Sequence, residues 1–389
     1  MKNFGYRKLG EIFEFQNGRA FNSKLWSTSG LPIIRIQNLN RLNAPFNYYQ
    51  GRYDPKDLVQ PGDLLFSWSG TIGSSFGPHI WDRETGILNQ HIFKVYYDDK
   101  VIWKKYAFYA LNEITAEIEK SVNGSVGLVH ITKKKLHEFV IPLPPILEQK
   151  RIVRILDEAF AGIDTAKANA EKNLQNARAI FDSHLESVLR SKKWKWKTLG
   201  DLCEKVEYGS AAKSKKEGKI PVLRMGNIKD GRLDWGNLVY TDNKAEIKKY
   251  QLKYNDVLFN RTNSPELVGK TAIYKNEMPA IFAGYLIRIH RKEDLLDADY
   301  LTYFLNSQIA FDYGKTVVIS SVNQANINGT KLKGYPIPTP SLSEQKAIVA
   351  KLDALSAEIQ RLAAIYERKL AALEALKKSL LHRAFAGEL

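Results

Sequence analysis

The sequence predicts an α+β protein, in which two tandem mixed α/β domains are separated by two long helices packed as an antiparallel coiled coil. Three observations support this fold class. The chain repeats its own motifs at an offset of about half its length. Each repeat begins with a block rich in glycine, asparagine and aromatic residues, which is typical of strands and turns. Each repeat ends with a glycine-poor block of helical periodicity, so we expect a pseudo-twofold internal repeat.

The internal repeat consists of motifs that return in the same order in both halves of the 389-residue chain. They are Leu9-Gly10-Glu11 with Leu199-Gly200-Asp201, Pro32 to Asn38 with Pro221 to Asn227, Asp63 to Phe66 with Asp256 to Phe259, Tyr106 and Asn112 with Tyr300 and Asn306, and Ile141 to Pro144 with Ile337 to Pro340. The offset changes only from 189 residues at Pro32 and Pro221 to 196 at Ile141 and Ile337. A chance match would not keep both order and spacing, so tandem duplication organises the chain.

The repeat divides the chain into four segments. The mixed α/β domains are 1–145 and 193–340, and the helical regions are 146–192 and 341–389. Short apolar or β-branched runs predict strands, and apolar periodicity predicts short helices. The predicted strands include 32–36, 63–66 and 91–97, and the predicted short helices are 106–120 and 300–311.

The helical regions follow Pro145 and Pro340, which suit a helix start because the first amides lack partners inside the helix. Ser341 and Glu344 have the spacing of a capping box. Apolar residues then recur at steps of mostly three and four, which indicates a coiled-coil seam. The seam positions are Ile152, Leu156, Ala159, Ile163, Ala166, Ala170, Ala177, Ile180 and Phe181 in the first copy, and Ile348, Leu352, Leu355, Ile359, Leu362, Tyr366, Leu370, Leu373, Leu376 and Leu380 in the second.

A helix of about 40 residues spans about 60 Å and must bury its apolar stripe. The other copy is the nearest partner of matching length. Because each helix leads away from its own domain, twofold duplication predicts antiparallel packing with the domains at opposite ends. The alternative is that each helix folds back on its own domain.

The chain is strongly basic, with a formal net charge of +16. The excess is shared by both domains, since 1–145 holds 18 basic and 13 acidic residues and 196–340 holds 22 and 16. A distributed positive field favours a polyanion such as nucleic acid, because binding releases the condensed counterions of the phosphates. A generally basic proteome or a need for solubility explains the charge equally well.

Other features exclude several classes of protein. Cys203 is the single cysteine, so neither an intrachain disulfide nor a cysteine-based zinc cluster can form. We find no signal peptide and no run of about 20 apolar residues, so we expect a cytoplasmic protein with no membrane segment. Catalytic motifs are also missing. Pro142 to Pro145 lacks the polar first residue of an adenine-methylation loop, two Gly-Lys-Thr tripeptides lack the first phosphate-loop glycine, and the histidines lack metal-ligand spacing.

What remains is recognition chemistry in polar loops at matching places of both halves. Arginine pairs with guanine, and asparagine or glutamine pairs with adenine, while hydroxyls and amides also bind phosphate. The candidate DNA-binding residues are Arg35, Asn38, Ser67, Trp68, Ser69, Thr71, Asn89, Gln90, His91, Ser125 and His130 in the first half, and Arg224, Asn227, Asn260, Arg261, Thr262, Asn263, Tyr285, Ser321, Asn323, Gln324 and Asn326 in the second. Polar loops of this kind are common on ordinary surfaces, but their recurrence strengthens the prediction.

Taken together, the chain resembles the specificity subunit of type I restriction-modification systems over its whole length. The resemblance rests on Ile141 to Gln149, Ile337 to Gln345, the stretch Gln324 to Ile327, and the ending His382 to Leu389. It implies that each mixed α/β domain recognises one half of a bipartite, asymmetric double-stranded DNA target, and that the helices act as a ruler between the halves. Where the second half has Gln324 and Asn326, the first has Leu128 and His130, so base contacts are not carried across at that position.

The resemblance also implies partners. Two methyltransferase subunits would dock along the helices, with Glu148, Gln149, Glu344 and Gln345 at the helix starts as candidate partner-subunit or helix positions. Restriction endonuclease and translocase subunits would join them. We expect no catalytic residue, metal or cofactor in this chain, and S-adenosylmethionine, ATP and Mg on the partners. The alternatives are a coiled-coil scaffold whose basic domains bind protein, and a DNA-modifying enzyme with its own catalytic site.

Overall fold

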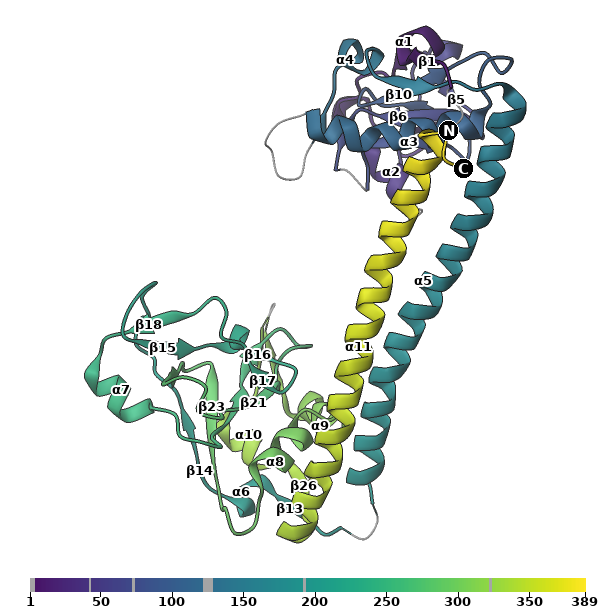
Figure 1. Cartoon of the computed structure of the whole chain (residues 1–389). Helices are drawn as coiled ribbons and strands as arrows, with labels where there is room; N and C mark the ends of the chain where they lie inside the picture. The colour runs from purple at the N-terminus through teal and green to yellow at the C-terminus, as the bar shows by residue number, and fades with distance from the viewer. Residues whose placement is uncertain (1–3, 42, 72–73, 122–128, 192–193, 322–323) are drawn as a thin grey trace. The chain divides into compact units, whose positions relative to one another are not determined.

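The structure is a computed structural model that describes residues 4–41, 43–71, 74–121, 129–191, 194–321 and 324–389. The chain forms two compact units, each described separately below. Unit 1 is Met1–Ala170 with Arg368–Leu389, and unit 2 is Glu171–Glu367. Each unit therefore combines one mixed α/β block with the start of the long helix that follows it and the end of the other long helix (Figure 1).

Unit 1 is built from short strands and helices around one main core. Its elements before the long helix are β1 (Tyr6–Lys8), α1 (Leu9–Ile12), β2 (Glu14–Asn17), β3 (Leu31–Ile34), α2 (Ile36–Asn40), β4 (Asn47–Tyr49), β5 (Leu58–Val59), β6 (Leu64–Ser67), β7 (Ser69–Gly70), β8 (Gly77–Ile80), β9 (Gly86–Leu88), β10 (Ile92–Tyr96), α3 (Lys104–Ser121), β11 (Val129–His130), α4 (Lys133–His137) and β12 (Val140–Pro142).

The strands of unit 1 form two four-stranded sheets and two short ladders. One sheet is antiparallel with the order β2-β10-β6-β8, and the other has the order β4-β3-β9-β5 with β3 and β9 parallel. The ladders are β1-β12 and β11-β7. Helix α3 and the start of the long helix contribute to the same core as the first sheet, which includes Phe15, Phe66 and Tyr106, all fully buried.

Unit 2 repeats this plan with additions. Its elements between the long helices are β13 (Trp196–Thr198), α6 (Leu199–Leu202), β14 (Cys203–Tyr208), β15 (Ile220–Leu223), β16 (Ile228–Lys229), β17 (Arg232–Leu233), β18 (Val239–Thr241), α7 (Lys244–Tyr250), β19 (Val257–Asn260), β20 (Thr262–Asn263), β21 (Thr271–Ile273), β22 (Ile281–Phe282), β23 (Leu286–Arg291), α8 (Ala298–Leu305), α9 (Gln308–Val317), β24 (Ile319–Ser321), β25 (Gln324–Asn326), α10 (Gly329–Lys333) and β26 (Pro336–Pro338).

The sheets of unit 2 correspond to those of unit 1. The order β14-β23-β19-β21 matches β2-β10-β6-β8, the order β18-β15-β22 matches β4-β3-β9, and β13-β26 matches β1-β12. The single short helix predicted for 300–311 is instead two helices, α8 and α9. The Ser307 Oγ accepts a hydrogen bond from the Ala310 amide, so Ser307 is the N-cap of α9 and separates it from α8.

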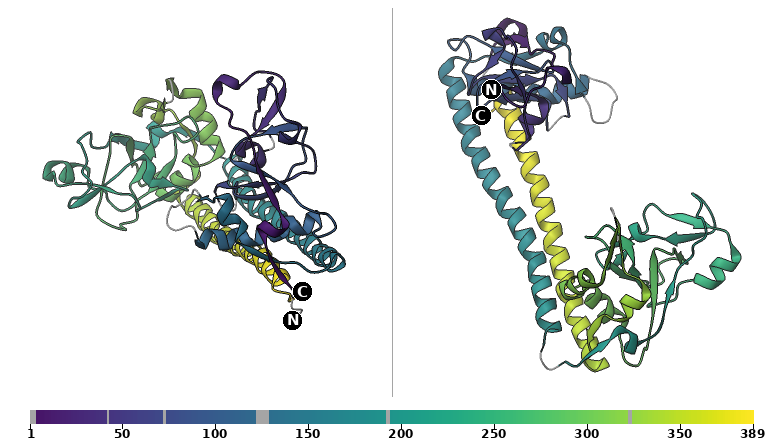
Figure 2. Two further views of the ribbon diagram at one scale, coloured as in Figure 1. Left: turned by 90° about the horizontal axis from the view of Figure 1, so that it is seen from above. Right: turned by 180° about the vertical axis from the view of Figure 1, so that it is seen from behind.

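The two long helices are α5 (Ile146–Leu189) and α11 (Leu342–Phe385), each of 44 residues. In unit 1 the start of α5 lies beside the end of α11 (Figure 2). Lys377 pairs with Asp164 at 3.0 Å and Lys167 with Glu374 at 2.6 Å, so residue numbers rise along one helix as they fall along the other. The predicted antiparallel pairing is therefore present. No helix among the described residues is long and apolar enough to cross a membrane.

Most seam positions are used as predicted, but two are not. In unit 1 Ile163 is buried in the core and Leu380 is partly buried against it, and in unit 2 Leu352 is buried near the end of α5. Ile180 is 59% exposed and Leu376 is 47% exposed, so both predicted seam positions face solvent. A seam of threes and fours drifts around a straight helix, because 3.6 residues per turn do not divide seven evenly.

The start of α5 is clamped to unit 1 by Gln149, whose side chain is fully buried. Its Oε1 accepts a hydrogen bond from the Trp103 amide at 2.8 Å, and its Nε2 donates to the carbonyls of Val101 and Pro144. Of the two roles predicted for Gln149, these contacts are those of a helix position, because every polar atom of its amide bonds within its own unit. Contact with a partner subunit stays a prediction. Glu148 is half-buried and pairs with Arg151.

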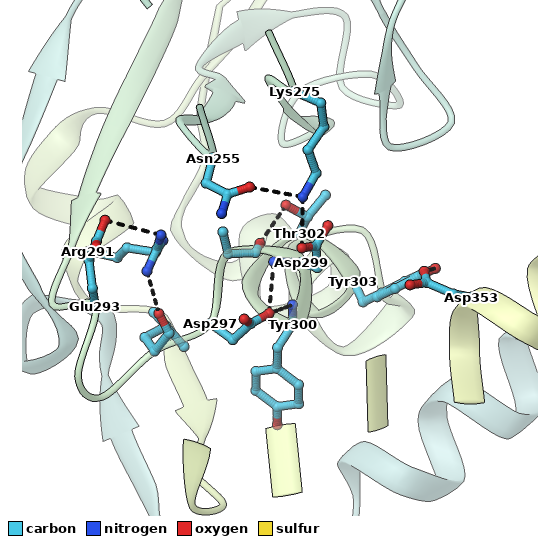
Figure 3. A network of polar contacts seen from close by, with 12 residues as sticks. Asn255, Lys275, Arg291, Glu293, Asp297, Asp299, Tyr300, Thr302, Tyr303 and Asp353 are labelled. Atoms are coloured by element: carbon cyan, nitrogen blue, oxygen red, sulfur yellow. Dashed lines mark hydrogen bonds and ion pairs between the residues drawn. The ribbon is translucent and has the colours of Figure 1, made fainter. Parts of the chain in front are cut away.

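Unit 2 contains the same clamp at the start of α11. Gln345 is fully buried, accepts from the Asp297 amide at 2.8 Å and donates to the carbonyls of Leu295 and Pro340, so it too serves as a helix position. Figure 3 shows the polar contacts around α8, which begins directly after Asp297. Asp297 caps α8, and the Tyr303 hydroxyl donates to Asp353 of α11 at 2.6 Å. Glu344 forms the predicted capping box with Ser341.

Unit 2 also encloses a buried ion network on β23. The Arg288 side chain is 6% exposed and bonds both Glu207 at 2.6 Å and Asp256 at 2.9 Å. Its Nη1 also donates to the carbonyl of Gln251. Burial alone would raise the pKa of Glu207, but hydrogen bonds from Arg288 and His290 outweigh it and hold that pKa below its ordinary value. Unit 1 has a simpler version, in which Lys94 pairs with Asp63.

We expect this network to make the stability of unit 2 sensitive to acid. Because the folded-state pKa of Glu207 lies below its ordinary value of 4.5, its contribution is complete above that pH and is lost as the pH falls through the folded pKa. We expect the protection factors of the amides in β14 and β23 to fall below about pH 4.5 more than those in β2 and β10 of unit 1. The Glu207→Gln variant should abolish the difference, and an unchanged difference would contradict the assignment.

Candidate nucleic-acid interface

The candidate site of unit 1 lies where β6 ends and the chain enters the β7-β11 ladder. The Trp68 amide donates to the carbonyl of His91 at 3.3 Å, and the Ile131 amide donates to the carbonyl of Trp68 at 3.0 Å. In the ladder, His130 lies opposite Ser69. Three segments that are far apart in the sequence, around 68, 91 and 130, are therefore held together by the backbone.

The side chains at this point form an aromatic cluster, which we call the Trp68 cluster (Trp68, His91 and His130). The Trp68 ring lies 5.2 Å from the His91 ring and 6.2 Å from the His130 ring, centroid to centroid. Trp68 Nε1 donates to the Gln90 carbonyl at 3.0 Å. Trp68 and His91 are half-buried and His130 is exposed. The His91 Nδ1 atom is buried without a hydrogen-bond partner among the described residues.

Unit 2 holds a cluster in the same backbone frame. The Arg261 amide donates to the Tyr285 carbonyl at 3.0 Å, and the Ile327 amide donates to the Arg261 carbonyl at 2.9 Å. Thr262 lies opposite Asn326 in the β20-β25 ladder. Arg261, Tyr285 and Asn326 therefore occupy the positions of Trp68, His91 and His130, and we call them the Arg261 cluster.

A second pair of predicted residues follows the parallel strands. Arg35 comes directly after β3 and Arg224 directly after β15, and both are half-buried. Arg35 Nη1 donates to Asn47 Oδ1 at 3.0 Å, and its guanidinium lies 5.1 Å from the Trp26 ring centroid. In unit 1 the Asn89 amide donates to the carbonyl of Ile34, which places the 89–91 segment next to the end of β3.

Several predicted contact residues are instead structural. Asn38 and Asn227 are 3% exposed, and each Oδ1 accepts from the amide of the arginine three residues earlier. Ser67 and Asn260 are fully buried and donate to the carbonyls of Ser69 and Leu267. These four predictions of direct DNA contact are corrected, because a buried side chain with internal partners offers no atom to a ligand in this conformation.

Of the remaining predictions, Ser69 and Thr262 are nearly buried, at 5% and 7% exposure, and support the ladders. Thr71 and Gln90 are exposed, while Asn89 and Asn263 are half-buried. Ser125 and Asn323 lie outside the described residues, and for Ser321 and Gln324 only the backbone is described, in β24 and β25. DNA contact by the exposed and half-buried residues stays a prediction.

The sequence search missed one residue that the structure places in the Arg261 cluster. Tyr208 ends β14, is 41% exposed, and its ring centroid lies 4.8 Å from the Arg261 guanidinium carbon. Tyr208 corresponds to Asn17 of unit 1. Each of these residues precedes a glycine whose amide donates to a carbonyl at the start of the neighbouring strand, β10 in unit 1 and β23 in unit 2. A polar-loop search passes over an aromatic residue inside a strand, but comparing the two halves position by position would have singled it out.

Comparison with known proteins agrees with this architecture. Residues 1–175 and 191–368 both match the family model described as the type I restriction modification DNA specificity domain. The specificity subunit of the type I restriction enzyme EcoBI from Escherichia coli is 25% identical over 98% of this chain and 85% of its own length. The StySPI specificity subunit from Salmonella potsdam is 27% identical over 92% of this chain and 82% of its own length.

A solved structure shows the same fold. A chain from a study of complex assembly and conformational transition of the type I R-M system superposes with a TM-score of 0.78 at 18% identity, covering 100% of this chain and 99% of that one. The duplicated units, the paired long helices and the two matched segments lead to one conclusion. The chain belongs to the type I restriction modification DNA specificity domain family and carries that domain twice.

Proposed function

We propose that this chain is the DNA-recognition subunit of a type I restriction-modification complex, in which each unit binds one half of a bipartite, asymmetric target. The observation that carries the proposal is the pair of clusters built on one backbone frame with different side chains, Trp68, His91 and His130 in unit 1 against Arg261, Tyr285 and Asn326 in unit 2. A shared frame sets a common way of approaching DNA, while different side chains read different bases.

The long helices supply the second part of the proposal. Each has 44 residues, which corresponds to roughly 66 Å at 1.5 Å per residue. A rod of this length is compatible with half-sites one to two turns of DNA apart, at about 34–36 Å per turn. Two methyltransferase subunits would dock along it, and endonuclease subunits would join them. The chemistry, with S-adenosylmethionine, ATP and Mg, would reside on those partners rather than on this chain.

The first test is binding to double-stranded DNA as a function of salt. We expect the chain, purified with its methyltransferase partners, to bind target DNA with an affinity that falls about tenfold or more when salt is doubled, because several neutralised phosphates release counterions. Fluorescence anisotropy with a labelled duplex measures this. Mapping methylated adenines in cells that carry the system supplies the target sequence. A chain that ignores DNA at low salt would support the scaffold alternative instead.

A further inference from the structure

Arg261 sits in a cradle built from three segments of unit 2. Its guanidinium stacks on the Tyr208 ring at the end of β14, with 4.8 Å between the guanidinium carbon and the ring centroid. Its Nη1 donates to the Gly284 carbonyl at 3.3 Å, and its Nη2 donates to Asn326 Oδ1 at 3.5 Å. The guanidinium plane is therefore defined by a ring on one face and by acceptors at both terminal nitrogens.

The two side chains that contact Arg261, those of Asn326 and Tyr208, are themselves fixed by hydrogen bonds. Asn326 Nδ2 donates to Thr262 Oγ1 at 2.8 Å, which turns Asn326 Oδ1 toward the arginine. The Tyr208 hydroxyl accepts the amide of Gly329 at 2.7 Å, which fixes the ring. A side chain that is already ordered loses less conformational entropy when it binds a ligand. Asn326 and Tyr208 therefore hold the planar guanidinium of Arg261 in one orientation.

Donor capacity remains on this prepared group. A guanidinium carries five N–H groups, two of which are used by Gly284 and Asn326. Each terminal nitrogen keeps one N–H, and Nε is buried with no partner among the described residues. Arg261 is half-buried, and the neighbouring Tyr208 and Tyr285 are 41% and 49% exposed. Two remaining N–H groups on one planar guanidinium suit two acceptors in one plane, which guanine O6 and N7 offer in the major groove.

The comparison of the two units favours a base over a phosphate. Phosphates are the same in every sequence, so a phosphate contact can use the same residue in both units. In the shared frame, however, the position of Arg261 is occupied by Trp68 in unit 1. Trp68 has a single side-chain N–H, and it is bonded to the Gln90 carbonyl. A position that differs within a frame shared by the two units is therefore a candidate for reading sequence.

We propose that Arg261 reads one guanine in the half-site bound by unit 2 through paired hydrogen bonds to O6 and N7, with Tyr208 and Asn326 as its positioning residues. This inference rests on the proposed function. It further implies that unit 1 reads its half-site at the equivalent position without an arginine.

The test combines changes in the DNA with changes in the protein. Once the target is mapped, each guanine of both half-sites is replaced singly by 7-deazaguanine, which removes the N7 acceptor, or by inosine, which keeps O6 and N7. Competition binding of the whole complex measures the affinities. For the wild-type complex we expect one guanine at which 7-deazaguanine weakens binding about tenfold and inosine does not, within the few-fold to about hundredfold range of a bidentate contact.

The protein variants identify the reader of that guanine. Arg261→Ala removes the donors, so it should weaken binding to the target by about tenfold more than binding to random DNA, and make the complex indifferent to 7-deazaguanine at that one position. Tyr208→Leu should weaken target binding in the wild-type background but not in the Arg261→Ala background. Arg232→Ala, at an exposed arginine of the same unit, is the matched control and should retain full discrimination.

Distinct results would overturn the inference and the proposed function. The inference is wrong if Arg261 binds phosphate. In that case Arg261→Ala weakens binding to target and random DNA equally, lowers the slope of log affinity against log salt by about one, and leaves the 7-deazaguanine effect intact. If no guanine responds to 7-deazaguanine in the wild-type complex, the inference also fails, while DNA recognition stands. If the wild-type complex shows no preference for its mapped target, the proposed function itself fails.

Discussion

Replacing Gln345 by leucine is expected to destabilise unit 2 by about 3 kcal/mol. The buried amide satisfies three backbone groups, namely the Asp297 amide and the Leu295 carbonyl before α8 and the Pro340 carbonyl before α11. Leucine has a similar volume but no polar atom, and each buried polar group left without a partner costs about 1–3 kcal/mol. Urea unfolding, with hydrogen exchange to assign the loss to unit 2, measures the change.

The effect of Gln345→Leu depends on burial, so an exposed glutamine of the same helix is the control. Gln360 is exposed and bonds only to the neighbouring Ser356 Oγ in the described structure. Gln360→Leu should therefore change stability by no more than about 0.5 kcal/mol. Gln149→Leu should reproduce the large loss in unit 1. Equal effects of the buried and exposed changes would show that Gln345 does not clamp the helix.

Arg288→Met is expected to cost about 3–5 kcal/mol, also in unit 2. The side chain is 6% exposed and compensates two carboxylates, Glu207 and Asp256, whose side chains are 20% and 16% exposed. Removing one member of a buried ion network leaves uncompensated charge in a poorly solvated site, which is the costly event. Thermal and urea unfolding at neutral pH provide the measurement.

A rescue variant separates lost charge compensation from lost packing. Replacing Glu207 by glutamine and Asp256 by asparagine in the Arg288→Met background should recover much of the stability, since the uncompensated charges are gone. As a surface comparison, Arg361→Met removes an ion pair with Glu358 whose partners are 69% and 51% exposed, and should cost less than about 1 kcal/mol. No recovery in the rescue variant would point to packing as the cause.

The elements that the sequence predicted well are those whose pattern is local. The strands expected at 63–66 and 91–97 correspond to β6 and β10, and the helix expected at 106–120 to α3. The break between α8 and α9 was missed because the run around Asn306 and Ser307 keeps a helical apolar period even though Ser307 caps a new helix. The exposure of Ile180 and Leu376 was missed because apolar periodicity predicts one apolar face of a helix, but not which turns of that face pack against another element.

The sequence predicted which segments form the candidate site, but not which of their side chains are exposed. The segments around Trp68, His91 and His130 do converge, as do those around Arg261, Tyr285 and Asn326. Polarity alone could not separate exposed residues from buried ones such as Asn260, since asparagine serves equally well as a ligand contact and as an internal support. Tyr208 escaped notice because its role depends on an arginine 53 positions later in the chain.

By itself, the sequence determined the duplication, the alternation of mixed and helical blocks, and the family, because repeats, periodicity and capping signals are properties of neighbouring residues. Only the tertiary structure decided that Gln149 and Gln345 turn inward, that Arg288 gathers two carboxylates, and that Tyr208 holds Arg261. The physical reason is that burial and hydrogen-bond partnership arise between segments far apart in the chain. A side chain acquires them only when the backbone brings those segments together.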